Sequence, residues 1–595
     1  MTSEKTEPLS AEWVARTQTS VDELMASDHA YWWLQSDPDQ GGARRLMRSG
    51  KGIQTACPQT PPGVAIGSQL HAYGGGSFTV APGSIWFVGG KDSKVYRILA
   101  AGAPELIVPA DDPYLYGDLH LSRAGRLLAV RGADDGDEIV ELGRDGSVRV
   151  LVRSTSFLAA PRLHDGTLAY LQWEQGEMPW DASRLWLADV SGTGVGRDGR
   201  VLAGGHDEAV VQPLWGPAGA LYFMSDRTGW WNLYRYRKGI TEPIAPMAAD
   251  CAPAPWEGGY QSYALSSSGE VVLTANDGVR TELMAIAADG TKRRLAANLT
   301  SVKPYIAALD TTVAVLGSTP SHAPALHLVD LATDREAPAV GGQALERHPR
   351  WTVSPPVVGV TQPGDSAVRY VLHTPDTDRP VPLIIRAHPG PTDDVPLRLD
   401  WTIQFFVSHG FAVAEVAYRG STGQGRAFRQ SLHGHWGEYD VEDCALVAEH
   451  LLRAGVASPG SVFITGASAG GYTALQAACQ PGPFTGATAT SAIIDPATWE
   501  RSVPRFQRPH AAALAGPAGA VRAEAVRVPV LLIHGLADEI TAASDARKLV
   551  DSLTRLGRPH ESLFIDGGDH YLSAPHDRAA ALKAELAFYE GLMSR

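Results

Sequence analysis

The sequence predicts two domains, an N-terminal all-β propeller and a C-terminal α/β-hydrolase domain. Three observations lead to this prediction. The chain has 595 residues, more than one hydrophobic core usually holds. Short β-type hairpins recur up to about residue 335, and strand-like runs alternate with helical stretches after about residue 345. We therefore divide the chain into 1–29, 30–340 and 341–595.

The first segment, residues 1–29, is expected to be a short helical lead-in. Trp13, Leu24 and Met25 provide apolar points in it, without a long stripe of the kind that buried helices show. The segment has no basic stretch followed by an apolar run, so we expect no secretory signal.

Residues 30–340 contain seven hairpins of one shape, an apolar run, a polar turn and a second run. They recur roughly every 40–50 residues, the period of propeller blades. A pair of β-sandwiches would also give short strands at regular spacing. The sevenfold recurrence favours the propeller, which leaves only short, protected sheet edges. The hairpins lie at 30–48, 83–99, 125–142, 166–190, 219–236, 269–286 and 311–331.

Residues 341–595 predict a mainly parallel sheet with crossover helices. Several runs are almost continuously apolar, as expected of strands covered on both faces. The expected strands are 381–388, 411–417, 461–465, 528–534 and 561–566, and the expected helices are 441–455, 544–557 and 577–593.

A serine lies between one of these strands and a helix-like stretch. The residues 466–470 read Gly-Ala-Ser-Ala-Gly, a GxSxG motif. Glycines on both sides permit a tight turn that projects the serine hydroxyl above the sheet. The helix N-terminus behind it favours the negative charge that develops in acyl transfer. Glycine is abundant in this chain, so the position of the motif after a strand is what makes Ser468 a candidate nucleophile.

An acid and a histidine follow the next expected strands in the order that this fold requires. Asp538 comes after 528–534, and His570 comes after 561–566. A base beside a serine, oriented by an acid, activates its weak hydroxyl nucleophile. We predict a triad of Ser468, Asp538 and His570. Other candidates are Asp566, Asp569 and Glu539 for the acid, and His534 and His576 for the base, with His534 expected in a structural role at a strand end.

The same chemistry needs an oxyanion hole. Its expected donors are the N–H of Ala469, directly after the nucleophile, and the N–H of Gly390, which follows the strand 381–388. A simple Pro-Gly turn would also explain Gly390.

These motifs resemble the prolyl oligopeptidase family of serine peptidases, on its acylaminoacyl-peptidase and dipeptidyl-aminopeptidase-like branch. The resemblance covers almost the whole chain. It implies that Ser468 is the nucleophile, Asp538 the orienting acid, His570 the general base, and Gly390 and Ala469 the oxyanion donors. It further implies a seven-bladed propeller that caps the active site and admits short peptides, without a metal or organic cofactor. The stretches that carry it are HAYGGGSF, MPWDASRLW, SDRTGWWNLYRY, AHPGPT, YRGSTGQGRAF and WGEYDVEDC.

Several positions depart from the family pattern. Ile540 stands where relatives commonly have Arg, and Ala72 and Gln507 stand where they often have Glu. Pro389 replaces a glycine of the oxyanion segment, and 508–527 is short and rich in Ala. Because these changes remove charges that could hold the polar ends of a peptide, we hypothesise a capped or hydrophobic peptide, or a small amide or ester, as substrate. Arg419 and Arg426 either face the active site or pair with acids.

The composition of the chain argues against several classes of binding partner. The net charge of −14 argues against nucleic acid. No apolar run is long enough for a membrane span. The four cysteines lie far apart without a CxxC pair, so we expect reduced thiols, no zinc site and a cytoplasmic location. A homo-oligomer is possible, since relatives form monomers, dimers and larger assemblies.

Three functions follow. The first is a serine hydrolase that cleaves short peptides, of the oligopeptidase, aminopeptidase or acylaminoacyl-peptidase type. The alternative is an amidase or esterase acting on a small-molecule or modified-peptide substrate in specialised metabolism. Amide cleavage needs protonation of a poor leaving amine, so matched amides and esters separate these two. A third, a binding propeller with a vestigial hydrolase, is opposed by the complete triad.

Overall fold

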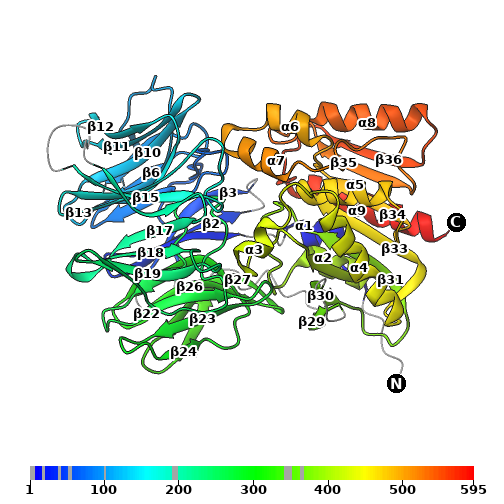
Figure 1. Cartoon of the computed structure of the whole chain (residues 1–595), viewed down its shortest axis with the longest axis horizontal. Helices are drawn as coiled ribbons and strands as arrows, with labels where there is room; N and C mark the ends of the chain where they lie inside the picture. The colour runs from blue at the N-terminus through cyan, green and yellow to red at the C-terminus, as the bar shows by residue number, and fades with distance from the viewer. Residues whose placement is uncertain are drawn as a thin grey trace.

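The computed structural model describes residues 7–16, 20–37, 42–50, 56–99, 102–190, 199–340, 351–361 and 367–594. Figure 1 shows two bodies side by side, one of short strands (blue to green) and one of mixed helices and strands (yellow to red). The first is a β-propeller and the second an α/β-hydrolase domain, so the predicted fold class is confirmed. We propose that the two domains divide near residue 340, between strands β28 and β29.

The propeller consists of seven four-stranded sheets within the described residues, each antiparallel with its strands in chain order. The seven predicted hairpins are the second and third strands of the seven blades. The strands are β1–β4 (Val21–Ser27, Ala30–Asp37, Ala43–Gly50, Cys57–Pro58), β5–β8 (Phe78–Ala81, Ser84–Val88, Val95–Leu99, Glu105–Leu106), β9–β12 (Leu115–Leu121, Leu127–Ala133, Gly136–Leu142, Val148–Ser154), β13–β16 (Phe157–His164, Thr167–Trp173, Ser183–Asp189, Arg200–Gly205), β17–β20 (Val210–Trp215, Leu221–Ser225, Asn232–Arg237, Ile240–Pro243), β21–β24 (Tyr263–Leu265, Val271–Asn276, Thr281–Ile286, Lys292–Leu295) and β25–β28 (Ser301–Leu309, Thr312–Thr319, His322–Asp330, Glu336–Val340).

The N-terminal segment differs from the predicted lead-in over 1–29. It holds one short helix, α1 (Ala11–Arg16), followed by strand β1, which pairs with β2 as part of the first blade. Burial explains the difference, because Val21 and Leu24 are buried in the propeller core. The apolar residues that we assigned to one helix therefore belong to two elements: Trp13 lies in α1, and Leu24 and Met25 lie in β1 of the propeller.

The hydrolase domain is built on an eight-stranded sheet with the order β29-β30-β32-β31-β33-β34-β35-β36. The pairs from β32 to β36 are parallel, as predicted, and β29 and β30 add an antiparallel edge. The strands are β29 (Val357–Val360), β30 (Arg369–His373), β31 (Val381–Ala387), β32 (Ala412–Ala417), β33 (Ala457–Ala467), β34 (Gly486–Thr490), β35 (Val530–Gly535) and β36 (His560–Ile565). The helices are α2 (Trp401–Ser408), α3 (Gly425–Gln430), α4 (Tyr439–Arg453), α5 (Ala469–Cys479), α6 (Pro496–Ser502), α7 (Arg508–Leu514), α8 (Ala543–Arg555) and α9 (Pro575–Met593), with one 3-10 turn, η3 (Arg505–Gln507), whereas the turn η2 (Pro217–Gly219) belongs to the propeller.

Both faces of this sheet are covered, which explains the nearly continuous apolar runs. Along β33, Val462 and Ile464 pack into the core under α4 and α5, whereas Phe463 packs into the opposite core with α9. Successive side chains of a strand point to opposite faces, so a strand buried twice needs apolar residues at every position. The carboxyl edge of the sheet is left as the place for polar residues.

The glycine-rich loop before α3 docks the hydrolase domain onto the propeller. Arg426 Nη1 and Arg429 Nη2 lie 2.8 and 2.7 Å from Oδ2 of Asp226, which follows β18. The N–H groups of Gly423 and Gly425 donate to Oδ2 of Asp250 at 3.0 and 3.1 Å. This decides one of the two arginines left open by the sequence, because Arg426 joins the domains.

Replacing Asp226 by alanine is expected to lower the free energy of unfolding by about 3–5 kcal/mol, the usual cost of removing one partner of a buried ion pair. The Asp226 and Arg429 side chains are 0% and 1% exposed, so Arg429 would keep its buried charge without its ion-pair partner. Chemical denaturation measures the change. The matched control is Asp207→Ala, an exposed acid nearby, for which we expect less than about 0.5 kcal/mol. Equal effects for the two variants would contradict the docking role of Asp226.

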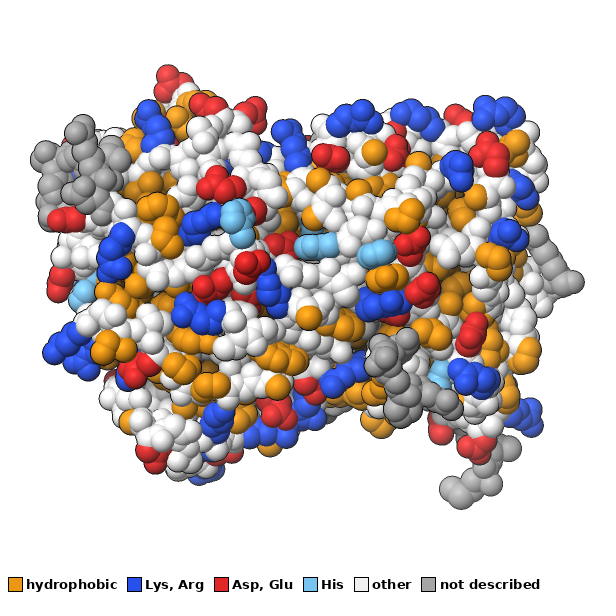
Figure 2. Space-filling view, in the orientation of Figure 1, with side chains coloured by type: hydrophobic (Ala, Val, Ile, Leu, Met, Phe, Trp, Pro, Cys, Tyr) orange, Lys and Arg blue, Asp and Glu red, His pale blue; other side chains and the backbone are white. Residues whose placement is uncertain are grey.

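The surface carries acidic and basic side chains interspersed over both domains on the face drawn in Figure 2. Among the described helices, none is both long enough and apolar enough to cross a membrane.

Candidate active site

Ser468 lies in the turn between β33 and α5, as the sequence predicts. Its backbone angles are φ +53° and ψ −116°, a strained conformation for a residue with a side chain. The N–H of Ser468 donates to the carbonyl oxygen of Thr490 at 2.9 Å, which ties the turn to the neighbouring strand β34. Strain at this position is typical of a nucleophile held on a strand-to-helix turn.

The two glycines of the motif are required by close packing. A Cβ on Gly466 would lie 2.2 Å from the carbonyl oxygen of Gly470, and a Cβ on Gly470 would lie 2.3 Å from the carbonyl oxygen of Ala387. Both distances are far below a normal contact, so only glycine allows the start of α5 to pack against β33 and β31.

Asp538 and His570 follow β35 and β36, the next parallel strands beyond β34. His570 Nδ1 lies 2.8 Å from Asp538 Oδ2, and the two side chains are 8% and 0% exposed. A proton at Nδ1 leaves Nε2 of His570 as a hydrogen-bond acceptor, the state required of a general base. The structure therefore brings this predicted pair together at the same sheet edge as Ser468.

Asp538 is held in its ionised form. Its Oδ1 accepts from the N–H groups of Ile540 and Thr541, both at 2.8 Å, and its Oδ2 accepts from Thr541 Oγ1 at 2.7 Å. Burial alone would raise the pKa of Asp538, but the hydrogen bond from His570 and those from Thr541 lower it overall. Thr541 is a supporting residue that our sequence analysis did not identify, although an acid followed three positions later by threonine is a common turn pattern.

The rival acids and bases have other positions. His534 Nε2 lies 3.0 Å from the carbonyl oxygen of Thr541 and 3.4 Å from Asp538 Oδ2, so it supports the acid from behind. His576 is 82% exposed beside Asp577. Asp569 Oδ1 accepts from the N–H of Ser573 at 2.8 Å. Asp566 and Glu539 are exposed.

The segment of Gly390 lies next to the start of α5. The carbonyl oxygens of Ala387 and His388 are the atoms that a Cβ on Gly470 would strike, which places this segment against the nucleophile turn. Gly390 has φ +118°, a conformation suited to glycine. Ala469, the other expected donor, is buried in the first turn of α5.

His388 holds this segment in place. Its ring stacks on Tyr418 with centroids 4.1 Å apart, and its Nε2 lies 2.7 Å from Ser421 Oγ. Burial lowers the pKa of His388 to about 4, so the ring is neutral at pH 7 and acts as a packing and hydrogen-bonding group.

A cavity of about 1140 Å³ lies between the domains and reaches His570. The hydrolase domain contributes Ile540 and Tyr571 to its wall, and the propeller contributes Ala72. Two of the positions that depart from the family pattern thus face this space with uncharged side chains. Among the described residues, no group of three or more His, Cys, Asp and Glu is arranged to hold a metal ion.

A third departure, Gln507, makes a contact between the domains. Its Nε2 donates to the hydroxyl of Tyr73 on the propeller, and the neighbouring Phe506 stacks on His71 with centroids 5.8 Å apart. Arg419, the second arginine left open, pairs with Asp443 on α4 at 2.8 Å. Gln507 is therefore engaged by Tyr73, and the charge of Arg419 is paired within the hydrolase domain.

Comparisons with known proteins agree with this geometry. The sequence profile of the prolyl oligopeptidase family matches residues 397–595. The acylamino-acid-releasing enzyme of Arabidopsis thaliana is 34% identical over 118 residues, 20% of this chain and 15% of that protein. Dipeptidyl aminopeptidase BIII of Pseudoxanthomonas mexicana is 26% identical over 237 residues, 37% of this chain and 34% of that protein. The chain thus matches well under two thirds of the length of these curated relatives.

Solved structures extend the likeness to the propeller. A puromycin-hydrolyzing peptidase of Mycobacterium tuberculosis superposes with a TM-score of 0.91 at 27% identity, over 98% of this chain and 96% of that one. A puromycin hydrolase gives 0.91 at 26% identity, over 99% and 96% of the two chains. An acylaminoacyl peptidase of Pyrococcus horikoshii shares the fold at 15% identity, with a TM-score of 0.72 over 97% of each chain.

Proposed function

We propose that this chain is a member of the prolyl oligopeptidase family, whose profile matches residues 397–595, and that it is a serine hydrolase that cleaves amide bonds in short peptides and related small amides. The observation that carries the proposal is the Asp538–His570 pair at the sheet edge that also holds the strained Ser468 turn. The same three positions were predicted from the sequence as nucleophile, acid and base.

The proposed mechanism follows from these positions. Ser468 Oγ attacks the substrate carbonyl while His570 Nε2 takes its proton, and Asp538 stabilises the imidazolium that forms. The N–H groups of Ala469 and Gly390 stabilise the oxyanion. His570 then protonates the leaving amine, and a water molecule, deprotonated by His570, releases the acyl group from Ser468.

The size of the substrate is limited by the interdomain position of the cavity. A space of about 1140 Å³ that is walled by both domains holds a peptide of a few residues or a drug-sized molecule. A folded protein does not fit between the domains, so we propose short substrates.

One carboxylate favours a substrate with a free amino group. Glu257, on the propeller, lies in a wall shared with Pro389 of the Gly390 segment. Its carboxylate raises the pKa of Tyr571, next to His570, although burial is the larger cause. Among the described residues it makes no ion pair within 4.0 Å, and burial and Asp22 raise its own pKa to about 7. Arg44 and Lys303 act on this carboxylate, and a substrate ammonium would add a direct, charge-assisted hydrogen bond to it.

The sequence-based hypothesis was a substrate with a blocked amino terminus. The position of Glu257 instead favours a substrate with a free amino group. Aminopeptidase and puromycin hydrolase are the activities in the names of two relatives, and puromycin is an aminoacyl amide with a free amine. The second candidate function is therefore hydrolysis of an aminoacyl amide of a small molecule, by the same groups.

The test compares phenylalanyl-p-nitroanilide, its N-acetyl derivative and the matched ester. We expect the free anilide to be cleaved fastest. Glu257→Gln is expected to lower kcat/KM for the free anilide about 10–100-fold, the range of a lost charge-assisted hydrogen bond, and to leave the acetylated substrate nearly unchanged.

The control is Glu539→Gln, an exposed carboxylate in the wall of the interdomain cavity that reaches His570. An equal loss on free and acetylated substrates would reject Glu257 as an anchor. Cleavage of the ester alone would reject the peptidase proposal and leave the esterase alternative.

A further inference from the structure

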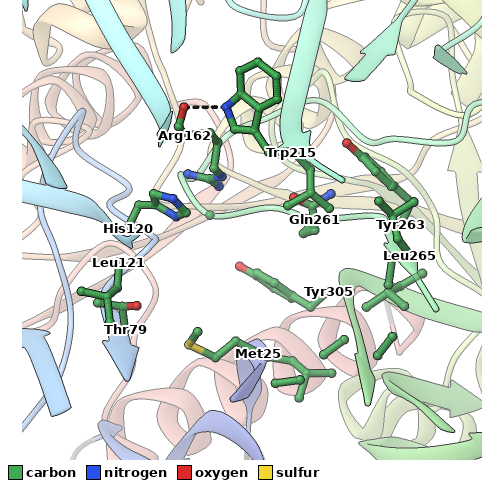
Figure 3. A pocket seen from close by; sticks show the side chains of 18 of the residues that line it. Met25, Thr79, His120, Leu121, Arg162, Trp215, Gln261, Tyr263, Leu265 and Tyr305 are labelled. Atoms are coloured by element: carbon green, nitrogen blue, oxygen red, sulfur yellow. Dashed lines mark hydrogen bonds between the residues drawn. The ribbon is translucent and has the colours of Figure 1, made fainter. Parts of the chain in front are cut away.

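The propeller encloses a channel of about 640 Å³, lined by the first strand of each of its seven blades. Figure 3 looks into it and shows His120, Arg162, Gln261 and Tyr305 around an open space. The indole N–H of Trp215 donates to the carbonyl oxygen of Arg162 at 2.9 Å and fixes one side of the wall. Such a channel offers a direct path toward the hydrolase domain, unless its inner end is closed.

Two glycine segments meet across that inner end, and we call them the glycine clasp. Residues 74–76 precede the second blade, and residues 258–259 precede the sixth, which is not its neighbour in the ring. Gly75 and Gly258 form a parallel β-bridge, and the N–H of Gly258 donates to the carbonyl oxygen of Gly74 at 2.7 Å. The clasp therefore joins two separate parts of the propeller by backbone hydrogen bonding.

The close approach in the clasp requires glycine. A Cβ on Gly75 would lie 2.2 Å from the carbonyl oxygen of Gly258, and one on Gly259 would lie 2.7 Å from the nitrogen of Gly76. Gly75 and Gly259 have φ of +91° and +77°, in the region that side chains disfavour. A third blade holds the clasp, since the N–H of Leu119 donates to the carbonyl oxygen of Gly76 at 2.9 Å.

The two faces of the clasp line different spaces. Gly76 and Gly259 form part of the channel wall. Gly75 and Gly258 line a separate cavity of about 50 Å³ on the other face, where Phe506 of the hydrolase domain packs. By this measure one water molecule needs roughly 10–15 Å³, so this second cavity has room for a few water molecules and none for a peptide. At the clasp, backbone and aromatic packing thus lie between the channel and Phe506 of the hydrolase domain.

The interdomain cavity has its own opening at the third blade. Its wall there is made by Leu115, which is 37% exposed, and by the exposed turn residues Asp134 and Asp135. Tyr571, beside His570 in the same cavity, is 62% exposed. We call this opening the lateral mouth.

We propose that substrates reach Ser468 through the lateral mouth, and that the glycine clasp closes the propeller channel to them. The glycines of the clasp are then specificity-determining residues, because they exclude any substrate that would have to thread the propeller. The inference rests on the proposed function, in which Ser468 is the nucleophile.

Single cysteines conjugated to a polyethylene glycol maleimide of about 5 kDa test the route. In a Cys57→Ser background, which removes the exposed thiol, Asp135→Cys places the polymer at the lateral mouth and Ser267→Cys places it at the outer end of the channel. Asp145→Cys is the matched control, since Asp145 is exposed on the next turn of the same blade.

Two readouts are taken, the rate at which a fluorophosphonate labels Ser468 and kcat/KM for the free anilide. We expect the Asp135 conjugate to lower both at least tenfold and the Ser267 and Asp145 conjugates to leave both within twofold. A slower reaction of the Ser267 conjugate, or an unchanged reaction of the Asp135 conjugate, would overturn the proposal. Absence of labelling in the unconjugated protein would instead count against the proposed function.

Discussion

Replacing Ser468 by alanine is expected to abolish fluorophosphonate labelling and to lower kcat for the free anilide by about a million-fold, the loss seen when a serine nucleophile is removed. The reason is chemical, because no acyl-enzyme forms without the hydroxyl. Alanine meets the same backbone strain as serine at φ +53°, so the variant removes the hydroxyl and keeps the turn. Labelling and initial rates with the purified protein measure the effect.

The control is Ser461→Ala, in the middle of the same strand β33. It is expected to label and turn over like the wild type. If Ser468→Ala kept its labelling, the nucleophile would have to be another residue, and the proposed function would be wrong.

Replacing Asp538 by asparagine is expected to lower kcat about ten-thousand-fold. In the protein, Oδ1 of Asp538 accepts two backbone N–H groups. An asparagine must therefore keep its oxygen there and turn its NH₂ group toward His570. The imidazole then accepts at Nδ1 and carries its proton on Nε2, where it cannot take the proton of Ser468.

This prediction has a readout besides activity. Nitrogen NMR of the histidine rings reports the tautomer, and we expect that of His570 to reverse in Asp538→Asn. Asp566→Asn, an exposed acid after the next strand, is expected to change neither the tautomer nor kcat. Activity of Asp538→Asn within tenfold of the wild type would show that Asp538 does not orient His570.

The sequence predicted the middle of each blade better than its inner and outer strands. The second and third strands form regular hairpins such as β10 and β11, whose register runs without a break. The inner strand β9 carries a bulge and the buried Asp118 with φ +47°, so its alternation is interrupted. The outer strands are often short, as β8 is with two residues. Periodicity arguments need longer and more regular segments than these.

In the hydrolase domain, one strand that the sequence missed lacks the expected composition. β34 reads Gly-Ala-Thr-Ala-Thr, and such small residues do not stand out as a buried strand, although α5 and α9 cover it. Thr541 and Glu257 were also missed. Their roles depend on contacts between distant parts of the chain. A single sequence does not reveal such contacts, because no fixed spacing along the chain marks them.

Helix α1 belongs to the hydrolase domain, although the propeller follows it in the chain. Val14 of the helix and Leu9 just before it pack in one hydrophobic core with Trp401 and Tyr589. In Figure 1 the helix lies beside α2 and α9. During synthesis, α1 leaves the ribosome hundreds of residues before its partners, so the propeller is free to fold first and the hydrolase core closes last. A catalytic domain expressed by itself would need this short helix supplied as a separate or fused peptide to cover its apolar groove.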